Sequence, residues 1–139
     1  MPTKGDSRPV QVSKNLVRSK DSISLFEGLV VNDTNARYSD PITCLAFSKF
    51  LLLLYIDSTL TPTDVHIEVE FLDQHTGKWY SYKQGVYASL YYEDSDTASG
   101  IYECFMGECS GRAMRLKITG SGTTSSAYFT ISASVELFG

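Results

Sequence analysis

The strongest constraint on the fold of this chain is a strict alternation of apolar and polar residues near its middle. From Asp64 onwards the sequence reads DVHIEVEFLDQHTGKWYSYK, and up to Phe71 every second residue is apolar. A period of two separates a buried face from a wet face in a β-strand but not in a helix. The polar segment QHTG ends in Gly77, which can adopt the positive φ of a turn before an aromatic strand begins. The segment therefore predicts a β-hairpin, in which Trp79 covers the open end of a β core.

The rest of the chain repeats this kind of pattern with turn-forming residues in between. Alternating segments lie at residues 23–31 (with a bulge expected at Gly28), 86–92, 101–106, 112–119 and 128–138. Residues 50–56 are apolar on both faces, which is typical of a strand in mid-sheet or at a subunit interface. Any helix is expected to be limited to a turn or two near residues 42–49. The sequence predicts an all-β fold, an antiparallel β-sandwich of the jelly-roll type.

The first 22 residues differ from the rest in composition and charge. They hold two prolines, no sustained apolar periodicity, and five basic against two acidic residues, a net charge of +3. Residues 23–139 hold seven basic and fourteen acidic residues, a net charge of −7. We therefore expect an extended basic arm at residues 1–22 and a single β-sandwich domain at residues 23–139.

The arm allows more than one interpretation. A solvated, disordered tail is the simplest. Nucleic-acid binding would favour a dense block of Lys and Arg with aromatic residues between them, which the arm lacks. Docking onto an acidic protein surface agrees with its charge. The residues expected to make that contact are Lys4, Arg8, Lys14, Arg18 and Lys20.

The cysteines and apolar runs suggest where the protein is assembled. Cys44, Cys104 and Cys109 cannot all pair within one chain, and the sequence does not open with a secretory leader. We expect free thiols in a protein assembled in a reducing cytoplasm, although the C-x4-C spacing of Cys104 and Cys109 would also suit a small disulfide or half of a metal site. The longest apolar run, residues 50–56, is too short to span a bilayer, so no membrane anchor is expected.

Catalytic and cofactor-binding patterns are weak. Residues 107–111 match G-x-C-x-G, but no strand-turn-helix setting that would activate a nucleophile is predicted there, and neither His66 nor His75 is placed to act as a base. Asp94 and Asp96 could begin a calcium loop, yet the other ligands of such a loop are missing. Phosphate-loop, dinucleotide and zinc-protease motifs are also missing. We expect no enzyme activity, no metal and no cofactor.

Two stretches of the sequence resemble a pattern of small virion proteins of tailed bacteriophages. In that pattern a T-x-T strand leads to a strand with Trp, and a G-R-x-x-R strand leads through a Gly-Thr turn to a final alternating strand. The matching positions are Thr61, Thr63, Val65, Trp79, Gly111, Arg112, Arg115, Gly122, Thr123 and Phe129. The resemblance covers about residues 45–137, without the arm and without residues 93–109. It implies a β-sandwich accessory protein of the virion, of the capsid decoration or cement type, often a trimer.

The leading hypothesis from the sequence is therefore a decoration protein that is assembled in the host cytoplasm, binds the major capsid protein on the outer capsid surface and stabilises the shell. The surplus apolar surface predicts a homo-oligomer, a trimer, with Leu52, Leu54, Tyr87 and Tyr91 at its interface. The alternative is a carbohydrate- or receptor-binding module of a phage tail or fibre. Its sugar-stacking residues would be Tyr80, Tyr82, Tyr87, Tyr91 and Tyr92, which could equally be ordinary sheet and interface residues.

Deletion of residues 1–20 tests the role of the arm. The arm has too little apolar content to offset the entropy of ordering it, so its contacts must come from another chain. We expect the truncated protein to keep the Tm of the intact chain and to bind capsids more weakly, as measured by thermal circular dichroism and co-sedimentation. Neutralising the five basic residues should weaken binding most at low salt, where screening is least. A large fall in Tm, or binding that is unchanged at every salt concentration, would contradict the hypothesis.

Overall fold

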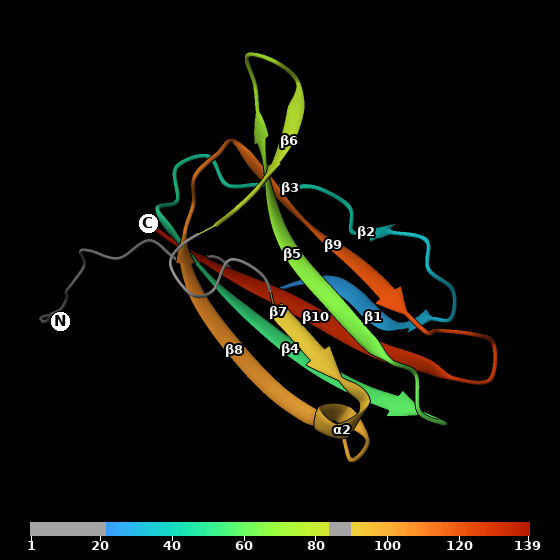
Figure 1. Ribbon diagram of the computed structural model, residues 1–139. Helices are drawn as coiled ribbons and strands as arrows, with labels where there is room; N and C mark the ends of the chain where they lie inside the picture. Colours follow the sequence, from blue (N-terminus) through green and yellow to red (C-terminus); the bar gives the residue numbers. More distant parts are fainter. Residues whose placement is uncertain (1–21, 84–89) are drawn as a thin grey trace, which may run out of the picture.

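The computed structural model of this chain describes residues 22–83 and 90–139, which form two antiparallel sheets packed against each other (Figure 1). Sheet A contains, in spatial order, β1 (Ile23–Val31), β10 (Tyr128–Phe138), β4 (Lys49–Thr59) and β8 (Ile101–Glu108). Sheet B begins with β2 (Arg37–Tyr38) and β3 (Ile42–Thr43), continues with β9 (Ala113–Ser121) and β5 (Asp64–Asp73), and ends with β6 (Lys78–Ser81) and β7 (Leu90–Glu93). This order, which places the first strand beside the last, is that of a jelly roll. The predicted all-β, jelly-roll-like sandwich is confirmed.

The core lies between the sheets and follows the predicted alternation. Every second residue of β10 is buried from Phe129 to Leu137, and β9 shows the same pattern from Met114 to Gly120. The inward side chains of β4 and β5 complete a single cluster of buried apolar residues. Because successive side chains of a strand point to opposite faces, each of these strands supplies one apolar row to the core.

The orientation of β4 shows that two of the residues predicted for the oligomer interface lie in the core instead. It lies in mid-sheet, as expected, because it pairs with both β10 and β8. Its register turns Leu52 and Leu54 inward, where they are 0% and 3% exposed. These two side chains fill the core of one chain and are not available to another subunit. The leucines of the outer face are Leu51 and Leu53, which are half-buried.

The helical turn also lies elsewhere than predicted. Residues 42–49 contain β3 and a turn in which Ala46 has a φ of 75°, a left-handed conformation that a helix does not allow. The helical turn is α2 (Asp94–Thr97), which begins with a capping box between Glu93 and Asp96. Within the described part of the chain, no helix has the length and apolar character of a membrane span.

The two aspartates considered for calcium binding are held by the protein itself. Asp94 accepts a hydrogen bond from the Ser58 hydroxyl at 2.6 Å, and Asp96 accepts one from the Glu93 N–H at 2.9 Å. These bonds fasten α2 to β4 and to the end of β7. No cluster of metal-binding side chains is found among residues 22–83 and 90–139.

Two glycines confirm the predicted irregularities. Gly28 has a φ of 59°, and the pairing of β1 with β10 shifts register on the N-terminal side of Leu29. Gly77 has a φ of 72° in the turn between β5 and β6. Both positions lie in the left-handed region that glycine adopts without a steric penalty.

A pair of leucine substitutions on β4 tests its register. Leu52→Ala removes a fully buried side chain and should lower the free energy of unfolding by about 3 kcal/mol. Leu53→Ala, one residue away on the outer face, should lower it by less than about 1 kcal/mol. Chemical denaturation of both variants measures the difference. Equal losses would mean that the outer face is as deeply buried as the core.

Candidate functional site

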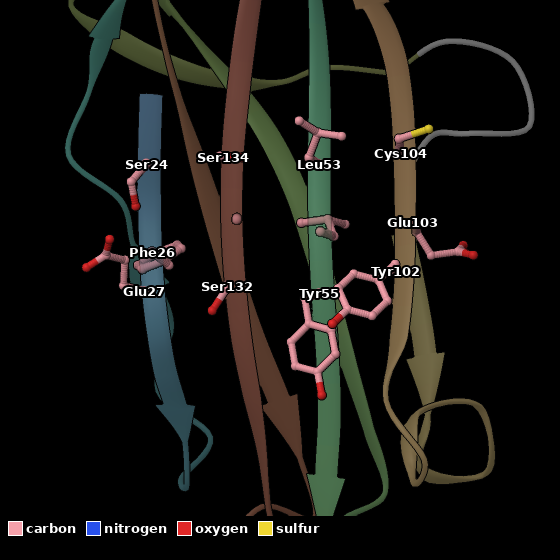
Figure 2. A pocket seen from close by; sticks show the side chains of 12 residues that line it. Ser24, Phe26, Glu27, Leu53, Tyr55, Tyr102, Glu103, Cys104, Ser132 and Ser134 are labelled. Atoms are coloured by element: carbon pink, nitrogen blue, oxygen red, sulfur yellow. The ribbon is translucent and has the colours of Figure 1, made fainter. Parts of the chain in front are cut away.

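A concave site is present as a groove on the outer face of sheet A, the side that faces away from sheet B. It has a volume of about 560 Å³ and crosses all four strands of the sheet. Figure 2 shows Ser132 and Ser134 of β10 between Ser24 and Glu27 of β1 on one side and Tyr55 and Tyr102 of β4 and β8 on the other. The lining is mainly apolar, with hydroxyl groups along the middle.

The sequence of β10 explains why the face is hollow at this place. Its outward residues include Ser132 and Ser134, which are much smaller than the side chains of the neighbouring strand. Ser132 pairs across the sheet with Tyr55, and Ser134 pairs with Leu53. A row of small residues beside a row of large ones therefore leaves a trough along β10.

Two tyrosines form the aromatic wall of the groove. Tyr55 and Tyr102 are cross-strand partners, and their ring centroids lie 4.6 Å apart with the planes at 41°. The Tyr55 hydroxyl donates to Asp57 Oδ2 at 3.1 Å, and this bond raises the pKa of Tyr55. Tyr102 is 82% exposed, so most of its ring is open to solvent. The Tyr55 ring contacts the Tyr102 ring, and the exposed part of the Tyr102 ring is a flat apolar surface.

Gly100 gives Tyr55 the space for this position. A Cβ atom on Gly100 would lie 2.7 Å from the Tyr55 hydroxyl oxygen, and its φ of 79° is itself unfavourable for other residues. A side chain here would displace the ring that supports Tyr102.

The opposite wall is polar and depends on the bulge in β1. The Gly28 N–H donates to the Ser132 hydroxyl oxygen at 2.9 Å, which holds the bulge against β10. Phe26 packs against the core, and the exposed Glu27 lies at the rim of the groove. A ligand in the groove would meet aromatic carbon on one side and hydroxyl and carboxylate oxygens on the other.

On the outer face of sheet B, an arginine contacts aromatic and acidic side chains of the same sheet. The Arg115 guanidinium carbon lies 4.3 Å from the ring centroids of both Tyr38 and Trp79. Its Nε donates to Glu70 Oε1 at 2.8 Å. Trp79 thus covers an arginine on the outer face and not the open end of the core, because its position on β6 turns the ring outward. The outward basic residues Arg115 and Lys117 of β9 lie beside Glu70 and Glu68 of β5.

A second polar cluster lies farther along the same face. His66 and Tyr91 meet edge to face, with ring centroids 4.8 Å apart. The Tyr91 hydroxyl lies 3.1 Å from Glu93 Oε2 and 3.3 Å from Asp64 Oδ2. Desolvation of the hydroxyl, together with the two carboxylates, raises the pKa of Tyr91 to about 12. The phenol therefore stays protonated and acts as a hydrogen-bond donor at neutral pH.

Several residues predicted from the sequence can now be placed. Tyr91 is 45% exposed on the outer face of sheet B, away from Leu52 and Leu54 in the core. The predicted interface residues therefore do not form one surface. Tyr87 and the five basic residues of the arm, Lys4, Arg8, Lys14, Arg18 and Lys20, lie outside the described residues.

The tyrosines predicted to stack on sugars do not form one platform either. Tyr82 packs against Phe50 and Phe71, and Tyr92 is buried with its hydroxyl directed to Glu103. Tyr80 is exposed on β6. Tyr55 and Tyr102, the pair that lines the groove, were not among the residues predicted from the sequence. Residue 55 has the outward parity once residues 52 and 54 are placed inside, but residues 50–56, apolar on both faces, do not give that placement.

Within residues 22–83 and 90–139, the cysteine of the G-x-C-x-G segment and the two histidines have different partners. Cys109 interacts with the thiol of Cys44, whereas His66 contacts Tyr91 and Asp64 on the outer face of sheet B. His75 lies in the turn between β5 and β6, where its N–H donates to Asp73 Oδ1 at 3.0 Å. The cysteine and the histidines that a nucleophile and its base would require are held in separate interactions.

Substitution of Arg115 tests how much its ion pair with Glu70 stabilises the fold. Glu70 is 7% exposed, so Arg115→Ala would leave a buried carboxylate without its cation and should lower the free energy of unfolding by about 3 kcal/mol. Lys117→Ala is the matched control, because Lys117 lies 3.8 Å from Glu68 in a more exposed pair. It should cost less than about 1 kcal/mol. Equal effects in urea denaturation would contradict the distinction.

Comparisons with known proteins add one structural likeness. No protein-family model and no curated protein sequence matches this chain. Among solved structures, the chain is similar to one described as "Family 16 Carbohydrate Binding Module-2". The two are 11% identical, the alignment covers 75% of this chain and 71% of that chain, and the TM-score is 0.46.

Proposed function

We propose that this chain is a carbohydrate-binding β-sandwich module and that a sugar lies in the groove on the outer face of sheet A. The observation that carries the proposal is the exposed ring of Tyr102, supported by Tyr55 beside a row of serine hydroxyls. A pyranose has an apolar face that stacks on an aromatic ring and hydroxyl groups that need polar partners. The groove offers both on opposite sides.

The jelly-roll fold agrees with this function but does not select it, because lectin domains and viral capsid proteins both use the fold. The choice therefore depends on the site. On sheet B, Arg115 lies over the rings of Tyr38 and Trp79. Tyr80 and Tyr91 of sheet B are 53% and 45% exposed, whereas Tyr102 of sheet A is 82% exposed. In the virion context that the sequence resemblance implies, such a module would belong to a tail or fibre and would bind host surface glycans.

Capsid decoration is a second proposal, favoured by a different feature of the same sheet. Leu51 pairs with Met106 and Leu53 pairs with Cys104, so apolar side chains continue from the groove along β4 and β8. Met106 is 63% exposed. An apolar row of this kind suits a contact with another protein. The deletion of residues 1–20 tests this role, since decoration also requires the arm.

Glycan binding can be measured directly. Intact protein on a glycan array should retain a subset of oligosaccharides, and calorimetry with one of them should give a 1:1 complex. Tyr102→Ala should weaken binding about fivefold or more, because stacking on an exposed ring contributes about 1 kcal/mol or more. Tyr102→Phe should retain most of the affinity if the ring face is what binds.

Tyr91→Ala is the matched control, because Tyr91 is an exposed tyrosine on the opposite sheet. It should leave glycan affinity unchanged. The proposal is wrong if no glycan binds, or if Tyr91→Ala and Tyr102→Ala weaken binding equally while both proteins remain folded.

A further inference from the structure

Two cysteines that are far apart in the sequence meet at one end of the sandwich. Cys44 follows β3, and its N–H donates to the Arg112 carbonyl at 2.8 Å. Cys109 follows β8, and its N–H donates to the Ser48 carbonyl at 2.8 Å. Phe47 N–H donates back to the Cys44 carbonyl at 3.0 Å, which closes the turn between Cys44 and Ser48. These backbone bonds hold the two cysteine-bearing turns side by side, and each thiol alters the pKa of the other.

The two thiols differ in surroundings. Cys44 is 2% exposed and belongs to the core, whereas Cys109 packs at the edge of the core and is partly open to solvent. The hydrogen bond with Cys109, reinforced by burial, raises the pKa of Cys44. The same bond lowers the pKa of Cys109, because the Cys44 thiol donates to the Cys109 sulfur. Cys109 is therefore the better nucleophile, since the thiolate is the reactive form.

We propose that Cys44 and Cys109 are a modification site that forms a reversible disulfide by exchange with a low-molecular-weight disulfide such as oxidised glutathione. The Cys109 thiolate attacks one sulfur of the glutathione disulfide, and one glutathione thiolate leaves. The Cys44 sulfur then attacks the Cys109 sulfur of the mixed disulfide, the second glutathione leaves, and the Cys44 proton passes to the departing glutathione thiolate. The protein loses two protons and two electrons, and two molecules of reduced glutathione are formed.

Cys104 does not take part in this exchange. It lies on β8 five residues before Cys109, and its side chain is exposed on the outer face of sheet A beside Leu53. Cys109, beyond the end of β8, packs against the core, so Cys104 and Cys109 are directed to opposite sides of the sheet. The short spacing of Cys104 and Cys109 in the sequence therefore does not make them the pair that forms a disulfide.

The bridge would connect the two sheets. Cys44 follows a strand of sheet B and Cys109 follows a strand of sheet A, with β4 to β8 between them in the sequence. A long closed loop restricts the unfolded chain strongly and so stabilises the folded state. Glutathione keeps such a pair reduced in the cytosol, whereas an oxidising exterior favours the disulfide. The site is independent of the proposed glycan-binding groove.

The test is disulfide mapping of the intact, folded protein. The protein is equilibrated with mixtures of reduced and oxidised glutathione, quenched with an alkylating reagent and digested without reduction. We expect a peptide pair linking Cys44 to Cys109 and a Tm about 10 °C higher in the oxidised form than in the reduced form. Circular dichroism before quenching verifies that the chain is folded in every mixture.

Three variants separate the roles. Cys44→Ala should trap one glutathione on Cys109, because the resolving thiol is missing, and Cys109→Ala should leave Cys44 unmodified. Cys104→Ser should form the same bridge as the unaltered protein. Mapping of the unaltered chain needs none of these variants to fold. The proposal is overturned if the folded protein forms no Cys44–Cys109 bridge in the most oxidising mixture, or if the bridge that forms contains Cys104.

Discussion

The antiparallel pairing of β4 with β10 is the interaction on which the rest of the structure depends. The two strands are the longest of the described residues and pair without a register shift from Lys49 and Phe138 to Thr59 and Tyr128. Because this register is continuous, every inward side chain of both strands reaches the core and every outward one reaches the outer face. A shift of β4 by one residue would turn Leu52 and Leu54 to the outer face and disrupt both the core and the groove.

The two outer faces use their polar residues differently. On sheet B, Arg115 neutralises the buried Glu70 and fills the space between two aromatic rings, so the polar groups satisfy one another. On sheet A, serines lie in the centre of the groove and tyrosines at its side, and the ring of Tyr102 is largely exposed. Burial of a charged group requires a partner in the same chain, whereas an exposed aromatic ring can be covered by a ligand. This difference is why the groove of sheet A is the better candidate for binding.

The Cys44–Cys109 pair and the groove lie on opposite sides of sheet A, near β8. Cys104 faces the groove with Tyr102, while Cys109, beyond the end of the strand, packs against the core beside Cys44. Chemistry at the cysteine pair would therefore alter the stability of the sandwich without contacting a ligand in the groove. A jelly roll can carry such independent features because its rigid sheets separate them.

The sequence by itself determined the strands whose pattern is local. The hairpin of β5 and β6 and the last strand, Tyr128–Phe138, were predictable because alternation with a period of two and a glycine in a turn are read within a few residues. It could not decide which leucines of β4 face inward, because a segment that is apolar on both faces has no alternation. The helical turn at Asp94–Thr97 was missed because it depends on a capping box and on Ser58. Only the tertiary structure brought Tyr55 to Tyr102 and Cys44 to Cys109, since both pairs depend on the pairing of strands that are distant in the sequence.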